Sequence, residues 1–220
     1  MTRTDSLRVG EFTLHSHQAD GIDDLRDALR RGASKVVLQG PCGVGKTIIA
    51  TALIHLARMK NKTILILTDS RQLVYQMVDK LDRCEIPSAT LMAGEDYWNS
   101  DVTVATKQTL FSRCFQKKTV PLPRADIVIV DEAHKSLSGE WATILREYRS
   151  AVQIGLTATP EDIGSWWEEI VVAGTYAELI PEFLVPARVW VPWEVDMRGV
   201  STRAGDDVGL EAEGRDPSLS

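Results

Sequence analysis

Apolar residues along this chain gather in short runs that alternate with longer amphipathic stretches. The runs are rich in β-branched residues and predict buried strands at residues 36–39, 63–67, 102–105, 127–130 and 151–156. Between them, apolar side chains recur at helical spacing from Lys46 to Ala57 and over residues 73–81. This alternation predicts a doubly wound α/β domain with a mostly parallel sheet, in which ligands bind at the carboxyl ends of the strands.

A phosphate-binding loop follows the first of these strands. Residues 40–47 read Gly-Pro-Cys-Gly-Val-Gly-Lys-Thr, the full G-x-x-x-x-G-K-[ST] pattern, between a predicted strand and a predicted helix. Backbone N–H groups of such a loop form an anion site at a helix N-terminus. We expect Lys46 to reach the β- and γ-phosphates of ATP and the Thr47 hydroxyl to ligate Mg²⁺. The predicted nucleotide-binding residues of the loop are Gly40, Gly43, Val44, Gly45, Lys46 and Thr47.

An acidic pair follows the apolar run at 127–130. Asp131 comes at the end of that predicted strand, where it can hold the same Mg²⁺ ion. Glu132 is placed to polarise a water molecule for in-line attack on the γ-phosphate. Together with Lys46, these residues predict that the chain binds ATP and carries the groups to hydrolyse it.

Composition excludes several other classes. The 220 residues allow one domain of ordinary size, or one and a half, and their hydrophobic and charged fractions are those of a soluble globular protein. No apolar run approaches the ~20 residues of a membrane span, and the N-terminus lacks an apolar signal region, so we expect a cytoplasmic protein without membrane contact. Cys42, Cys84 and Cys114 lack metal-ligand spacing, which predicts neither zinc nor a disulfide.

The charge distribution leaves two interpretations open. A net charge of −6 argues against indiscriminate nucleic-acid binding through the global field. Between Asp101 and Asp126, however, the chain has no acidic residue, and this interval is either a solvated surface loop or a phosphate-contacting patch. Its basic residues are Lys107, Arg113, Lys117, Lys118 and Arg124.

The composition of the chain changes near its end. Residues 194–220 are rich in acidic residues and poor in apolar ones, which predicts a flexible acidic tail or the start of a linker. We therefore expect one folded domain over residues 1–193, followed by this segment. The adjacent Trp166 and Trp167 are expected to supply one core ring and one ring that anchors a partner or stacks on a base.

Further motifs occur in a characteristic order along residues 12–193. Leu14-His15-Ser16-His17-Gln18 precedes the loop, Asp131-Glu132-Ala133-His134 follows it, and Leu156-Thr157-Ala158-Thr159-Pro160 comes last. This order resembles the first RecA-like domain of superfamily 2 helicases, in the DEAH-bearing branch that includes RadD-, RecG- and type III restriction-like translocases. The resemblance implies a nucleic-acid-dependent ATPase with ATP and Mg²⁺ as cofactors.

The resemblance also implies roles for individual residues. By this resemblance, Gln18 would contact the edge of the adenine base. His134 would couple the nucleotide site to the last motif through Thr157 and Thr159. A further set would follow the sugar-phosphate track of one DNA or RNA strand with little sequence preference. This set comprises Ser70, Arg71, Gln72, Gly94, Thr106, Lys107 and Gln108.

Superfamily 2 motors have two RecA-like domains, and the second supplies arginine fingers that are worth 10³–10⁵ in turnover where they have been measured. Either the chain is truncated before this domain, or a protein partner or self-association provides it; in both cases we expect feeble ATPase activity from the chain alone. Two other functions compete with this one. One is a non-enzymatic docking module, which would have no chemical need for Lys46, Asp131 and Glu132 together. The other is a small-substrate kinase, against which the Asp-Glu-Ala-His and Thr-Ala-Thr elements count.

Overall fold

The computed structural model describes residues 8–135, 139–160, 166–180 and 182–185. The chain divides into two units, Met1–Val185 and Pro186–Ser220, and the description below concerns the first. The predicted domain boundary after residue 193 and the predicted flexible tail lie outside the described residues, so both stay predictions.

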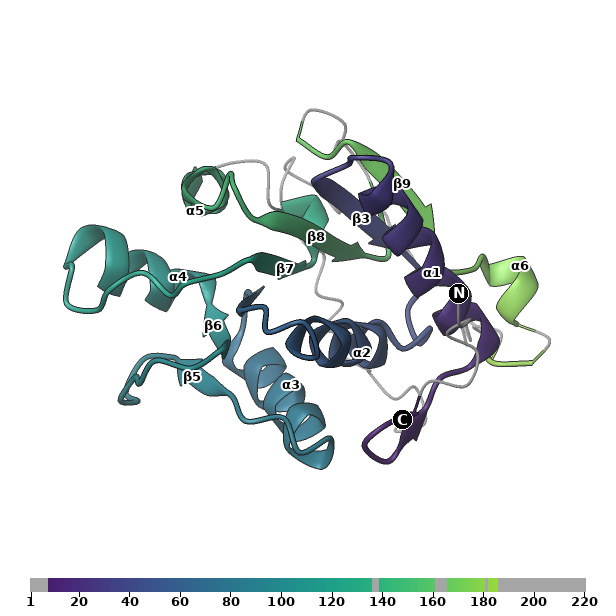
Figure 1. Ribbon diagram of the computed structural model, residues 1–220, viewed down its shortest axis with the longest axis horizontal. Helices are drawn as coiled ribbons and strands as arrows, with labels where there is room; N and C mark the ends of the chain where they lie inside the picture. Colours follow the sequence, from purple (N-terminus) through teal and green to yellow (C-terminus); the bar gives the residue numbers. More distant parts are fainter. Residues whose placement is uncertain (1–7, 136–138, 161–165, 181, 186–220) are drawn as a thin grey trace, which may run out of the picture. The chain divides into compact units, whose positions relative to one another are not determined.

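A seven-stranded parallel sheet forms the centre of the described domain (Figure 1). Its strand order is β5-β6-β4-β7-β8-β3-β9, and every neighbouring pair is parallel. The central strands are covered on both faces, and all residues of β4 and β6 are buried. The strands are β3 (Lys35–Gln39), β4 (Ile64–Thr68), β5 (Ala89–Leu91), β6 (Val102–Thr106), β7 (Ile127–Asp131), β8 (Val152–Thr157) and β9 (Glu169–Val172).

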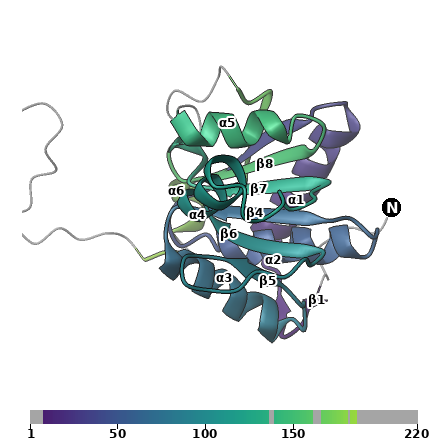
Figure 2. The ribbon, with the colours of Figure 1, turned by 90° about the vertical axis from the view of Figure 1, so that its left-hand side faces the viewer.

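Helices cover both faces of the sheet, as Figures 1 and 2 show. On one face α1 (Ser16–Arg30), α2 (Lys46–Arg58) and α3 (Arg71–Arg83) bury their apolar stripes in one hydrophobic cluster. On the other face α4 (Lys107–Leu110) and α5 (Gly139–Glu147) pack in a second cluster. The predicted doubly wound α/β fold is thus confirmed.

Shorter elements complete the domain. A hairpin of β1 (Arg8–Val9) and β2 (Phe12–Thr13) precedes α1. A π-helical turn, Phe111–Gln116, continues α4, a 3₁₀ turn, Ala133–Lys135, follows β7, and α6 (Tyr176–Leu179) follows β9.

The predicted strands and the structure agree within about one residue at the central positions. The expected strands at 36–39, 63–67, 102–105, 127–130 and 151–156 are β3, β4, β6, β7 and β8. The edge strands β5 and β9 were not predicted. β5 has only three residues, and the apolar run of β9 is short, with Ile170 and Val172 exposed at the edge of the sheet.

Candidate functional site

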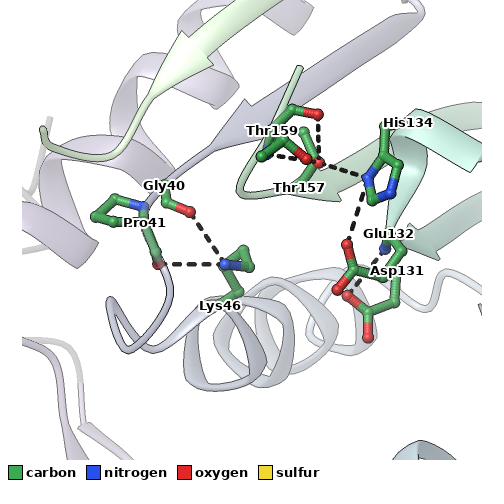
Figure 3. Close-up of polar contacts among 8 residues, drawn as sticks. All are labelled: Gly40, Pro41, Lys46, Asp131, Glu132, His134, Thr157 and Thr159. Carbon is green, nitrogen blue, oxygen red and sulfur yellow. Dashed lines mark hydrogen bonds and ion pairs between the residues drawn. The ribbon is translucent and has the colours of Figure 1, made fainter. Parts of the chain in front are cut away.

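Three neighbouring strands end at one place on the carboxyl edge of the sheet. The register pairs Gln39 of β3 with Thr157 of β8, and Leu156 of β8 with Asp131 of β7. The phosphate-binding loop leaves β3 here, and the backbone N–H of Gly40 donates to the Thr157 carbonyl at 3.0 Å. Because parallel strands end side by side, motifs far apart in the sequence meet at this edge (Figure 3).

The conformation of the loop requires glycine at defined positions. Gly43 and Gly45 have φ values of +86° and +87°, in the left-handed region that residues with a Cβ rarely adopt. A Cβ on Gly45 would lie 2.3 Å from the Gln18 Nε2 atom. Within the described residues no side chain caps the N-terminus of α2, which leaves this end of the helix open to an anion. Val44 is buried beneath the loop, and Thr47 is half-buried in that first turn.

The ammonium of Lys46 lies over the loop. Its Nζ atom donates to the carbonyl oxygens of Gly40 and Pro41 at 3.0 and 3.2 Å (Figure 3). Both acceptors are neutral, and among the described residues no carboxylate is hydrogen-bonded to this ammonium. A triphosphate supplies the anionic partner that this arrangement fits.

The carboxylates of Asp131 and Glu132 lie opposite the loop. Burial raises the pKa of Asp131, the negative charge of Glu132 raises it further, and the charge of Lys46 acts against both. A divalent cation would offset this unfavourable burial of negative charge. The Asp131 carboxylate and the Thr47 hydroxyl are hard oxygen ligands of the kind that Mg²⁺ prefers, so the residues fit this ion.

Glu132 is held in a strained backbone conformation. Its φ of 54° is left-handed, which costs on the order of 1–3 kcal/mol for a residue other than glycine. Its N–H donates to Asp131 Oδ1 at 3.1 Å. Such strain is typical of functional sites, where the surrounding structure fixes the direction of a side chain.

A chain of hydrogen bonds connects β7 with the end of β8. His134 Nδ1 lies 3.0 Å from Thr157 Oγ1 and 3.4 Å from Glu132 Oε2. Thr157 Oγ1 donates to the Thr159 carbonyl and accepts from the Thr159 N–H, both at 3.1 Å. The expected contact between His134 and Thr157 is therefore present, whereas Thr159 joins the chain through its backbone (Figure 3).

Gln18 lies against the loop with its amide turned inward. The side chain is 3% exposed, Nε2 donates to the Val44 carbonyl at 3.0 Å, and Oε1 accepts from the His15 N–H at 3.0 Å. His17 also reaches the Val44 carbonyl, at 3.3 Å. Both ends of the Gln18 amide are thus used by the protein, and its predicted contact with adenine stays a prediction.

Some of the predicted nucleic-acid residues line a common hollow. Gly94, Gln108, Arg113 and Lys117 border a hollow of about 740 Å³ where β5 and β6 end. Its lining combines residues of the acid-free interval with Glu95 and Asp96, which bring two carboxylates to the same hollow. Between the neighbouring strand β4 and α3, Ser70 caps the helix by accepting from the Leu73 N–H at 3.3 Å.

Arg71 and Gln72 begin α3 with exposed side chains, and Arg71 Nη2 lies 3.3 Å from the Tyr75 hydroxyl. These two residues therefore remain accessible to a ligand.

Thr106 and Lys107 differ from the expectation. Thr106 is 4% exposed, and its hydroxyl donates to Thr109 Oγ1 at 2.9 Å within the first turn of α4. Lys107 Nζ lies 3.5 Å from a Glu140 carboxylate oxygen and 5.8 Å from the centre of the Trp141 ring. Both side chains are turned into the domain because α4 packs against α5. Neither side chain therefore points its polar group toward a nucleic-acid strand.

The tryptophan pair is likewise integrated into the fold. Trp167 is buried, as expected for one ring. Trp166 Nε1 donates to Gln153 Oε1 at 2.8 Å, and Lys35 Nζ lies 4.1 Å from the centre of its ring. The second ring is therefore half-buried at the sheet edge, and the cation covers a face that a nucleobase would need.

Comparison with known proteins places the chain in a family. The model of the family described as "Type III restriction enzyme, res subunit" matches residues 11–162, more than half of the chain and all the motifs of the nucleotide site. The chain belongs to this family. The endonuclease subunit of the type I restriction enzyme EcoKI from Escherichia coli K12 is 29% identical over 186 residues, which are 71% of this chain and 16% of that subunit.

Solved structures of other proteins share the fold of this chain. The UvsW helicase from bacteriophage T4 aligns with a TM-score of 0.57 at 18% identity, over 73% of this chain and 60% of that chain. The SWI2/SNF2 ATPase core of Sulfolobus solfataricus in complex with dsDNA aligns with a TM-score of 0.56 at 18% identity, over 74% and 36%. These likenesses establish a RecA-like fold.

The family match confirms the expected first RecA-like domain of a superfamily 2 helicase. Membership of the DEAH-bearing branch with RadD and RecG stays a prediction. Among the described residues, none of the helices combines the length and the apolar character that crossing a bilayer requires.

Proposed function

We propose that this chain is an ATP-binding, nucleic-acid-dependent ATPase domain of a superfamily 2 translocase of the DEAH-bearing branch. The observation that carries the proposal is the convergence of Lys46, Asp131 and Glu132 at one edge of the sheet. The His134–Thr157 contact connects these residues to the last motif. A docking module would need no such set of groups.

Each of the converging groups has a chemical task. The loop N–H groups and Lys46 bind and orient the triphosphate, and the Thr47 hydroxyl and Asp131 would hold Mg²⁺. When bound, this ion would neutralise charge that develops on the phosphoryl oxygens. Glu132 accepts a proton from the attacking water, and its left-handed backbone directs the carboxylate toward the loop.

We further propose DNA or RNA as the activating ligand and a second RecA-like domain as the completing partner. Arg71, Gln72, Gly94 and Gln108 would contact the sugar-phosphate backbone of one strand. So would the basic residues of the acid-free interval other than Lys107, namely Arg113, Lys117, Lys118 and Arg124. A solved neighbour is a complex with dsDNA, which supports nucleic acid as a ligand. The described residues form one RecA-like domain, so the arginine finger would come from a second domain outside them, whether in a longer form of this chain, on a partner protein or on a second copy.

The test is the steady-state ATPase rate of the purified chain with and without single- and double-stranded DNA and RNA. Lys46→Ala should abolish nucleotide binding while sparing the fold, and Glu132→Gln should preserve binding and block hydrolysis. Glu147→Gln, on the exposed face of α5, is the matched control for charge removal. The site assignment is wrong if Lys46→Ala and Glu132→Gln both hydrolyse ATP like the parent.

A further inference from the structure

Glu95 lines the hollow of about 740 Å³ where β5 and β6 end, which we refer to as the β5–β6 hollow. A tight turn after β5 sets its position: the Glu95 N–H donates to the Met92 carbonyl at 3.4 Å, and Gly94 has a φ of +83°. A glycine with positive φ at this place is typical of a type II turn. The half-buried side chain of Glu95 brings a negative charge to a surface proposed to bind phosphates. Such a charge repels the ligand, so its presence calls for another task.

Both oxygen atoms of the Glu95 carboxylate are hydrogen-bonded within the protein. Thr90 Oγ1 on β5 donates to Oε2 at 2.6 Å, and the Tyr75 hydroxyl on α3 donates to Oε1 at 3.3 Å. The carboxylate therefore bridges a strand and a helix beside the hollow. The neighbouring carboxylate of Asp96 is exposed and forms no hydrogen bond within the part of the chain that the structure describes.

Glu95 also connects to two arginines on different elements. Arg113 Nη1, in the π-helical turn, donates to the backbone carbonyl of Glu95 at 2.9 Å. Arg71 Nη2, in the first turn of α3, donates at 3.3 Å to the Tyr75 hydroxyl, which in turn donates to the Glu95 carboxylate. One residue thus holds Arg113 directly and Arg71 through Tyr75.

These contacts orient the two arginines without neutralising them. Their acceptors are a hydroxyl and a backbone carbonyl, and neither guanidinium forms an ion pair with a carboxylate among the described residues. Lys107 is the contrary case, because its ammonium is paired with Glu140. A guanidinium carries five N–H donors in one plane, so a single hydrogen bond fixes its direction and leaves further donors for a phosphate.

From this arrangement we infer that Glu95 is a positioning residue of the nucleic-acid surface, which directs Arg113 and, through Tyr75, Arg71 toward the phosphates of the bound strand. The inference rests on the proposed function, because the strand is the proposed activating ligand. Its consequence is opposite to that of simple electrostatics. If Glu95 acted by its charge alone, removing the side chain would strengthen phosphate binding, whereas loss of a positioning residue weakens it.

The test measures the affinity of the full chain for labelled oligonucleotides by fluorescence anisotropy, over a range of salt concentrations. Single- and double-stranded DNA and RNA are compared, and the variants are titrated with the one that the parent binds most tightly. Glu95→Ala should weaken binding about tenfold and reduce the salt slope by up to about 2, one for each arginine that no longer reaches a phosphate. Glu95→Gln keeps an acceptor oxygen and the length of the side chain, and should bind at least as tightly as the parent.

Asp96→Ala is the matched control, since it removes a carboxylate from the same hollow without removing a hydrogen bond. It should bind slightly more tightly than the parent, because a like charge is lost. Thermal unfolding and binding of the non-hydrolysable ATP analogue AMPPNP verify the fold of each variant, and both should match the parent for Asp96→Ala and Glu95→Gln.

Tyr75→Phe separates the two arginines. The change removes the hydroxyl between Arg71 and Glu95 and keeps a ring that is 51% exposed, so the fold should be unaffected. We expect binding to weaken about threefold and the salt slope to fall by about 1. In an Arg71→Ala background, Tyr75→Phe should have no further effect, because the residue that it positions is gone.

The outcomes separate the two proposals. If the parent binds none of the oligonucleotides, the proposed nucleic-acid function fails, and the task of Glu95 fails with it. If the parent binds, but Glu95→Ala binds as tightly as Glu95→Gln or more tightly than the parent, the positioning role is wrong while the proposed function stands. Unchanged affinity and salt slope in Tyr75→Phe would likewise overturn the connection to Arg71, whatever the stability of Glu95→Ala.

Discussion

Replacing Thr157 by valine removes a single hydroxyl from a fully buried position and keeps the shape of the side chain. That hydroxyl takes part in three hydrogen bonds, one with His134 and two with the backbone of Thr159. A neutral hydrogen bond contributes about 0.5–1.5 kcal/mol net. Because Thr159 is exposed and can turn to water, we expect a total loss of about 1–2 kcal/mol in the free energy of unfolding.

For a domain of this size, that loss corresponds to a fall of roughly 2–8 °C in the unfolding midpoint. Thermal and urea unfolding provide the assay, and the urea m value should not change. Thr159→Val is the matched control, since Thr159 contributes its backbone alone, and its effect should stay within about 0.5 kcal/mol. Thr157→Ser keeps the hydroxyl and should lose only about 0.8 kcal/mol, the value of one buried methyl group.

The same variants test whether Thr157 couples the nucleotide site to nucleic-acid binding. We expect Thr157→Val to bind AMPPNP like the parent while losing most of its stimulation by nucleic acid, and Thr159→Val to keep that stimulation. Equal unfolding midpoints for Thr157→Val and Thr159→Val would refute the structural reasoning. Full stimulation of Thr157→Val would refute the coupling role.

Three further predictions concern other parts of the domain. Gly155→Ala in β8 would place its Cβ 2.6 Å from the nearest side-chain atom, so we expect a loss of about 1–3 kcal/mol in urea unfolding; an unchanged midpoint would contradict this packing. Hydrogen bonds from Ser34, foremost its backbone N–H, lower the pKa of Glu168 from its ordinary value of 4.5. The stability from this carboxylate is therefore present above pH 4.5 and lost as the pH falls through the lowered pKa, and the advantage of the parent over Glu168→Gln should shrink over that range in pH-dependent unfolding. Lys117→Ala should weaken DNA binding and reduce its salt slope by about 1, whereas Lys107→Ala should change neither, because Lys107 is paired with Glu140; the reverse result in salt titrations would refute the surface assignment.

The central sheet could be predicted because its strands are short, near-continuous apolar runs rich in β-branched residues. Residues such as 64–67 and 128–130 are buried on both faces, and only a strand between two helical layers suits such a run. β5 and β9 escaped prediction because edge strands are short and partly exposed. Pairing with β6 and β3, respectively, fixes these two strands, and that pairing depends on residues far away in the sequence.

The nucleotide site likewise has parts that the sequence predicts and parts that it does not. The loop at 40–47 and the pair Asp131-Glu132 are local patterns: their glycines, lysine and carboxylates have the same chemistry wherever the chain carries them. Their meeting at one edge followed from the prediction of parallel strands. The orientation of the surrounding side chains did not follow from any pattern.

Gln18, Thr106 and Lys107 illustrate this limit. Motif position predicts a ligand-facing role for all three, yet their polar groups bond to Val44, Thr109 and Glu140. Glu95 carries no motif signal at all, and its contacts with Tyr75 and Arg113 arise where the turn after β5 meets α3 and the π-helical turn. The local sequence was therefore sufficient for the fold class and for the groups that bind phosphate. Which polar groups face the ligand was set by packing between elements distant in the chain, because a side chain is free for a ligand only where no neighbour satisfies it first.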